Sequence, residues 1–188
     1  MTPVAFLDAS VLYPSTIRSV LMFLAAFDVF RVQWSEDVHS AWTTALGRDR
    51  PDLDAKRIAR TRALMEAYLP NAMVSSFERR IPNLVLPDPS DLHVLAAALH
   101  CKAHVIVTTK LKHFPKAVLS SQGMLAQHPD DFVCDLIDAD RDRAVLAFAA
   151  DRARMVNPPH SVAEYISGIE VGGLKKSAAM LRGVEDRL

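Results

Sequence analysis

Residues 84–108 read LVLPDPSDLHVLAAALHCKAHVIVT. The apolar run 84–86 predicts a short strand, the apolar residues of 92–101 recur at helical spacing, and the β-branched run 105–108 predicts a second strand. Asp88 is the natural N-cap of the helix, with a proline at the first helical position. A strand, a helix and another strand in this order are typical of a parallel sheet with helices on its faces.

The beginning of the chain repeats this pattern. Val4–Leu7 predicts a buried strand that ends at Asp8, and residues 17–27 have helical spacing. Residues 29–34 predict a second short strand or a helix terminus, and Ser35 is a good N-cap for the helix that follows. The sequence therefore predicts an α/β fold with a mostly parallel sheet, whose working site lies beyond the carboxyl ends of the strands.

The last fifty residues differ from the rest of the chain. Beyond about residue 138 the pattern is purely helical, so we expect a domain over 1–137 and a helical C-terminal extension over 138–188. The apolar run Val20–Phe27 is too short to span a bilayer. Two cysteines far apart, with no CxxC pair, predict neither a disulfide framework nor a zinc ribbon. These features predict a soluble cytoplasmic protein without a membrane segment.

The charge is balanced overall but segregated along the chain. The 22 basic and 22 acidic residues give a formal net charge of zero, which argues against an indiscriminate polycation. Residues 92–129 contain four lysines and no acidic residue, and residues 48–62 contain six basic against three acidic residues. Residues 130–151 contain seven aspartates against two arginines. The positive segments are compatible with local contact to a nucleic-acid backbone, although a solvated helix face also explains residues 48–62.

Three aspartates on separate segments can meet at one edge of the predicted sheet. They are Asp8, Asp88 and Asp91. Close carboxylates repel each other unless a proton or a cation intervenes, and Mg²⁺ is held by one or two carboxylates plus waters. Asp88 and Asp91 also have an ordinary structural explanation, because carboxylates are favoured at the beginning of a helix.

Three segments in this order resemble the successive motifs of PIN-domain proteins. They are residues 6–12 (FLDASVL), 88–98 (DPSDLHVLAAA) and 105–115 (VIVTTKLKHFP). This family includes the VapC-type toxins of bacterial toxin–antitoxin pairs. The resemblance implies a PIN-like α/β/α sandwich and an endoribonuclease that depends on Mg²⁺ or Mn²⁺. It also implies an RNA substrate, an antitoxin partner and a homodimer.

The family's acidic site is only partly present in this chain. Asp8 and Asp91 match two acidic positions and are the implied metal ligands, with Asp88 as a third catalytic carboxylate. The second acidic position, usually a glutamate six residues after the serine, falls on Ala41. Glu36 and Asp37 lie nearby, and Asp37 shares the helix face of position 41 one turn away.

The last motif also departs from the family. Lys110 stands where the family has Asn or Asp, and His113 occupies the next polar position. Histidine can serve as an outer ligand or a phosphate contact, whereas lysine cannot bind magnesium. At about 4 Å and an effective dielectric near 20, an ammonium stabilises a carboxylate by about 4 kcal/mol, so Lys110 could neutralise Asp8 or Asp91. Ser10 and Thr108 are supporting candidates from the same motifs.

Two functional hypotheses follow. The chain is a metal-dependent endoribonuclease, or it is a catalytically degenerate PIN fold that binds RNA or a protein. A haloacid-dehalogenase-type phosphatase is disfavoured, because Ser10 stands where that class needs a second aspartate. A zinc site at His93 and His100 is disfavoured as well, because seven residues separate them by two helical turns.

Overall fold

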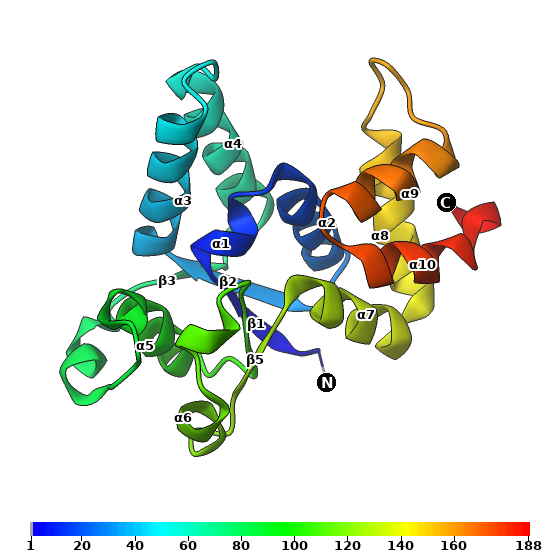
Figure 1. Cartoon of the computed structure of the whole chain (residues 1–188). Coiled ribbons are helices and arrows are strands. Elements are labelled where there is room, and N and C mark those ends of the chain that lie inside the picture. The colour runs from blue at the N-terminus through cyan, green and yellow to red at the C-terminus, as the bar shows by residue number, and fades with distance from the viewer. Residues whose placement is uncertain (1) are drawn as a thin grey trace. The chain divides into compact units, whose positions relative to one another are not determined.

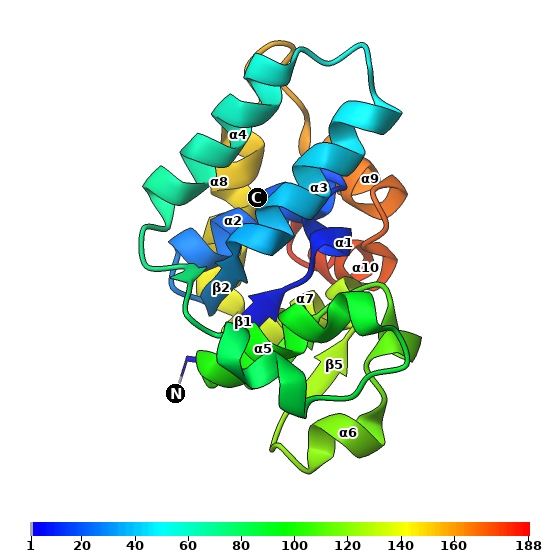
Figure 2. The same cartoon turned by 90° about the vertical axis from the view of Figure 1, so that its left-hand side faces the viewer.

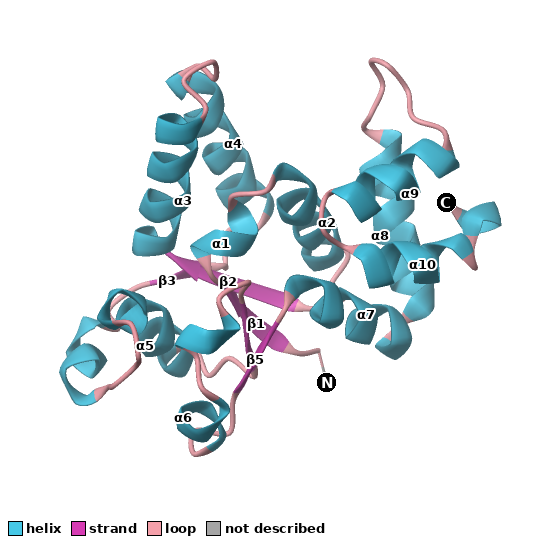
Figure 3. Ribbon diagram, viewed as in Figure 1, coloured by secondary structure: helices cyan, strands magenta, loops and turns pink. Residues whose placement is uncertain are grey.

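The computed structural model describes residues 2–188 and contains a five-stranded sheet in which every strand pairing is parallel. The strand order is β3-β2-β1-β4-β5. Figure 3 shows the strands in magenta. The bounds are β1 Val4–Leu7, β2 Arg31–Ser35, β3 Met73–Val74, β4 Val105–Val107 and β5 Leu125–Gln127. The predicted α/β class with a mostly parallel sheet is therefore confirmed.

The two central strands form the core of the sheet. In β1, residues 5–7 are fully buried, and all of β4 is buried. Strands covered on both faces read as continuous apolar runs, which is why the sequence revealed both of them. Leu7 pairs in register with Val107, so Asp8 and Thr108 follow at the same edge of the sheet.

Five α-helices, of which α1 has only four residues, belong to the same compact unit as this sheet. They are α1 Ala9–Leu12, α3 Glu36–Asp49, α4 Ala55–Tyr68, α5 Leu92–His100 and α6 Lys116–Ser120. Helix α5 packs against β1, β2 and β4, and Figure 2 shows it beside β1. Helices α3 and α4 pack against each other as a helical hairpin (Figure 1).

Both predicted caps are present. The hydroxyl of Ser35 accepts a hydrogen bond from the backbone N–H of Val38 at the start of α3. Asp88 accepts from the backbone N–H of Ser90, but the residues it caps form a 3-10 helix, Pro89–Asp91, which leads into α5. Further 3-10 helices are Glu78–Asn83, Leu111–His113 and Glu185–Arg187.

The strand predicted at 84–86 is wrong. These residues form no strand, and Val85 is 80% exposed. A strand needs a neighbour for its backbone groups, but this segment lies between a 3-10 helix and Pro87 and pairs with no strand of the described chain. The strand that pairs with β2 at the edge of the sheet is instead the two-residue β3.

The second compact unit is helical. It contains Thr2 and residues 14–30 and 129–188, whereas residues 3–13 and 31–128 belong to the first unit. Its helices are α2 Ser15–Ala26, α7 Pro129–Ala139, α8 Arg141–Ala153, α9 Val162–Val171 and α10 Lys175–Arg182. The division of the chain at residue 137 stays a prediction. No helix within residues 2–188 is both long enough and apolar enough to cross a membrane.

A buried carboxylate joins three elements of this helical unit. Asp151 is 1% exposed and accepts hydrogen bonds from the hydroxyls of Ser19 and Tyr165 and from the guanidinium of Arg154. Burial and the charge of Asp151 raise the pKa of Tyr165, so its hydroxyl stays protonated and donates. The network ties α2, α8 and α9 together.

Candidate functional site

Asp8 lies immediately after β1 and is 2% exposed. Its Oδ2 atom accepts hydrogen bonds from the hydroxyls of Ser10 (2.6 Å) and Thr108 (2.8 Å). The backbone N–H of Asp8 donates to the carbonyl of Val107, which extends the pairing of β1 with β4 by one residue. The carboxylate is therefore fixed by two neighbouring strand ends, as the parallel topology predicts.

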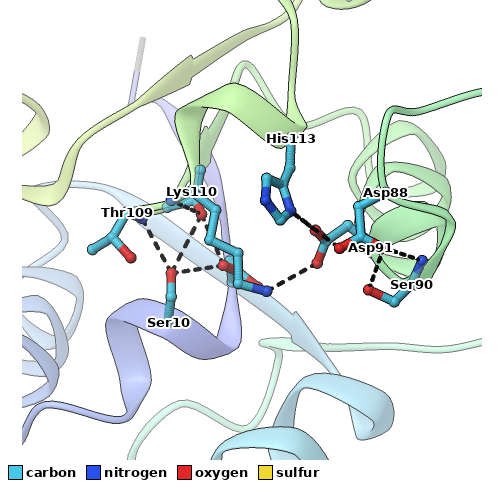
Figure 4. Close-up of polar contacts among 9 residues, drawn as sticks. Ser10, Asp88, Ser90, Asp91, Thr109, Lys110 and His113 are labelled. Atoms are coloured by element: carbon cyan, nitrogen blue, oxygen red, sulfur yellow. Dashed lines mark hydrogen bonds and ion pairs between the residues drawn. The ribbon is translucent and has the colours of Figure 1, made fainter.

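Asp91 lies at the junction of the 3-10 helix and α5 and is 3% exposed. Its Oδ1 atom is 3.1 Å from the ammonium of Lys110, and its Oδ2 atom is 2.6 Å from Nδ1 of His113. Figure 4 shows both side chains reaching toward Asp91. Each oxygen of this buried carboxylate thus has a protein partner.

Asp88 is more exposed and is held by Ser90. One carboxylate oxygen accepts from both the backbone N–H (2.9 Å) and the hydroxyl (2.7 Å) of Ser90, and these hydrogen bonds lower the pKa of Asp88. The other oxygen is 3.4 Å from Nδ1 of His113. The sequence indicated Asp88 but not the role of Ser90. The Asp-Pro-Ser order is the signal that could have shown it, because aspartate side chains bind the backbone two residues on.

The loop after β4 places Lys110. Its backbone N–H donates to the hydroxyl of Thr108 (3.0 Å), and the backbone N–H of Thr109 donates to the hydroxyl of Ser10 (3.1 Å). Burial lowers the pKa of Lys110, but the charge of Asp8 and the hydrogen bond and charge of Asp91 outweigh it. The pKa of Lys110 therefore lies above its ordinary value, and its side chain stays cationic.

The residues at this edge include a donor set that fits a divalent cation. Asp88, Asp91 and His113 each offer a ligand atom, and these atoms all lie within 4.8 Å of one another. Carboxylate oxygens suit Mg²⁺ and Mn²⁺, and an imidazole nitrogen completes a mixed set. Of the two ligands predicted from the sequence, Asp91 belongs to this cluster and Asp8 does not. Asp8 lies in the adjoining network and is linked to it through Thr108 and Lys110.

The two acidic residues at the start of α3 do not join this cluster. Glu36 forms a bidentate ion pair with Arg62 of α4, at 2.5 and 2.8 Å. Asp37 is exposed, and no hydrogen bond or ion pair within residues 2–188 connects it to Asp8 or Asp91. Ala41, at the position of the family's second acidic residue, is also exposed. The site is therefore built from the segments around residues 8, 91 and 110.

Comparison with known proteins gives two matches. Residues 129–183 match the family described as the VapC50 C-terminal domain. The chain is 38% identical over 95 residues to the Mycobacterium tuberculosis protein named "Putative ribonuclease VapC50", an alignment that covers 48% of this chain and 55% of that protein. The chain thus spans about half the length of this relative. No solved structure matched.

The family match lies in the helical C-terminal part of the chain and covers helices α7 to α10. The similarity to a protein named VapC50 agrees with the motif resemblance to VapC-type proteins. Together they support the similarity of the chain to VapC-like PIN proteins.

Proposed function

We propose that the chain is a metal-dependent endoribonuclease of the toxin–antitoxin type. The observation that carries this proposal is the placement of two almost fully buried aspartates, Asp8 and Asp91, at one edge of the sheet. Burying charged carboxylates costs free energy, and buried ionisable groups of this kind cluster at functional sites. The similarity to a protein named as a ribonuclease supports the same class.

The site residues have distinct roles in this proposal. Asp91, Asp88 and His113 would hold Mg²⁺ or Mn²⁺, with Asp8 as the neighbouring carboxylate. When bound, such an ion supplies Lewis-acid stabilisation of the phosphodiester and a water nucleophile at neutral pH. Ser10 and Thr108 orient Asp8 by donating hydrogen bonds to its Oδ2 atom.

The cationic residues available for RNA are fewer than the sequence suggests. In the basic segment 48–62, Arg48, Arg50 and Arg62 form ion pairs with acidic neighbours. Within residues 2–188, no ion pair is formed by the remaining basic residues of that segment or by the lysines around the site loop. These are Lys56, Arg57, Arg60, Lys112 and Lys116. We assign phosphate contacts to these residues, together with Lys110 beside the carboxylates.

A non-catalytic PIN fold that binds RNA or a protein is the second candidate. It is favoured by Lys110, whose ammonium already neutralises Asp91, and by Ala41 in place of an acidic residue. The resemblance further leads us to propose an antitoxin partner, a homodimer and a cytoplasmic location. In both candidates residues 138–188 form the helical extension.

The experiment that separates the two candidates combines metal binding with cleavage. Calorimetric titration with Mg²⁺ and Mn²⁺ is carried out beside an RNA cleavage assay, on the parent chain, Asp8→Asn and Asp138→Asn. Asp138 is a matched control, because it is an exposed aspartate on α7. We expect metal binding and cleavage by the parent and the control, and reduced cleavage by Asp8→Asn. Absence of metal binding, with equal RNA turnover by all three proteins, contradicts the nuclease.

A further inference from the structure

A backbone hydrogen bond of Lys110 fixes this residue beside the acidic site. Its N–H donates to Thr108, whose hydroxyl in turn donates to Asp8, and its ammonium reaches Asp91 (Figure 4). The side chain is 40% exposed, compared with 69% for Lys176 in its surface ion pair. Lys110 is thus placed by the same loop contacts that fix the carboxylates.

The charge of Lys110 has no substitute nearby. Among residues 2–188, no other lysine or arginine forms an ion pair with Asp8, Asp88 or Asp91. His113 contacts two of these aspartates, but it adds a positive charge only when it is protonated. Buried carboxylates that lack a cation are strongly destabilising. Lys110 therefore supplies the permanent positive charge on which this group of carboxylates depends.

The ammonium engages the same carboxylate that the candidate ion needs. Asp91 belongs to the set that fits a divalent cation, and its Oδ1 atom is the partner of Lys110. A divalent ion on Asp91 would stand close to a like-charged ammonium, and like charges at this distance repel in a partly buried site. The lysine and the ion are therefore alternative partners of Asp91.

We propose that Lys110 is a tethered cation that competes with the divalent metal for Asp91. This competition raises the concentration of divalent ion at which the site is filled. The inference rests on the proposed function, because it concerns the same site. The metal-free state is neutralised by the lysine, and loading requires the ammonium to leave Asp91. The family's Asn or Asp at this position carries no such competing charge.

The test is a Mn²⁺ titration by calorimetry of four proteins: the parent, Lys110→Gln, Lys110→Arg and Lys112→Gln. Lys110→Gln removes the competing charge, and we expect it to bind Mn²⁺ at least about tenfold more tightly than the parent. Lys110→Arg keeps a cation at this position and should bind as weakly as the parent. Lys112→Gln removes the same charge two residues away, and its affinity should change less than about twofold.

A thermal melting series gives a second readout that needs no calorimetric signal. In chelator, Lys110→Gln should melt below the parent, because Asp91 has lost its cation. Added Mn²⁺ should raise its melting temperature by more than it raises that of the parent. If Lys110→Gln is unfolded in chelator, Mn²⁺ should restore a cooperative melting transition. An equal response of the two proteins to Mn²⁺, or an Mn²⁺ affinity of Lys110→Gln no higher than that of the parent, overturns the inference.

The outcomes also separate this inference from the ribonuclease proposal. Tighter Mn²⁺ binding by Lys110→Gln, without RNA cleavage by any variant, supports the competition and removes the nuclease. Metal-dependent cleavage by the parent, with no change in affinity in Lys110→Gln, supports the nuclease and removes the competition.

Discussion

The hydroxyl of Thr108 donates a 2.8 Å hydrogen bond to Oδ2 of Asp8, although a hundred residues separate them in sequence. The two residues follow neighbouring parallel strands, β4 and β1. The same hydroxyl accepts the backbone N–H of Lys110. Thr108, which is fully buried, therefore links the carboxylate after one strand to the loop that carries the competing lysine.

Replacing Thr108 with valine tests this link. The change keeps the shape of the side chain but removes one donor to a buried carboxylate and the acceptor of the Lys110 amide. We expect the free energy of unfolding, measured by urea denaturation, to fall by about 1–3 kcal/mol. Thr108→Ser, which retains the hydroxyl, should lose less. Equal stability of Thr108→Val and the parent would show that these hydrogen bonds contribute nothing.

His39 makes the stability of the first unit sensitive to acid. The side chain is fully buried, Trp42 donates to its Nδ1 (3.0 Å), and burial followed by the charge of Arg62 lowers its pKa from 6.5 to about 4. The unfolded chain therefore binds more protons than the folded chain between these two pH values. We expect unfolding free energy to fall by about 1–3 kcal/mol as pH drops from about 6.5 to about 4.

The pH dependence is measured by urea denaturation at a series of pH values for the parent and His39→Gln. Glutamine can accept the Trp42 hydrogen bond but cannot be protonated. The difference in stability between the two proteins should change over this pH window and be constant above pH 7. A difference that is constant across the whole range would exclude His39 as the source.

In the second unit, Asp151→Ala removes the acceptor shared by Ser19, Arg154 and Tyr165. The hydroxyl of Tyr165, in a side chain that is 2% exposed, is left without its carboxylate partner. We expect a loss of about 2–4 kcal/mol in unfolding free energy, and a smaller loss of about 1 kcal/mol for Tyr165→Phe. Thermal and urea melts of both variants check this. A loss below about 0.5 kcal/mol for Asp151→Ala would contradict the structural role.

The proposed RNA contacts of α4 predict a change in salt dependence. Arg57→Gln and Arg60→Gln each remove a guanidinium that has no ion pair within the described chain, and each should lower the slope of log affinity against log salt by about 1. Arg50→Gln is the matched control, because Arg50 is paired with Asp52. Fluorescence anisotropy of a labelled RNA at several KCl concentrations measures these slopes. Identical slopes for all three variants would remove α4 from the RNA surface.

Much of the fold follows from local sequence. The buried strands β1 and β4 are continuous apolar runs, and the caps at Ser35 and Asp88 follow from side-chain chemistry. The strand predicted at 84–86 fails because strand formation depends on a partner that the local pattern does not show. Strand β5 escaped prediction for the related reason that its residues, Leu125–Gln127, are weakly apolar and partly exposed, and pairing with β4 defines them.

The site was predictable in outline and not in its pairings. Parallel topology brings the residues after β1 and β4 to one edge, so the convergence of Asp8 with the loop around Lys110 could be expected. The sequence left open whether Lys110 would neutralise Asp8 or Asp91, and the structure gives Asp91. The sequence could not show that Glu36 forms an ion pair with Arg62, because that pair depends on how α3 and α4 pack.

The most direct test of the ribonuclease proposal is the cleavage of a labelled RNA by the parent and by Asp91→Asn, in Mn²⁺ and in chelator. We expect cleavage by the parent in Mn²⁺ and none in chelator. We also expect a rate at least about 100-fold lower for Asp91→Asn, which loses a charge from the proposed metal-binding set. Equal rates for the two proteins, or cleavage that is unaffected by the chelator, would contradict it.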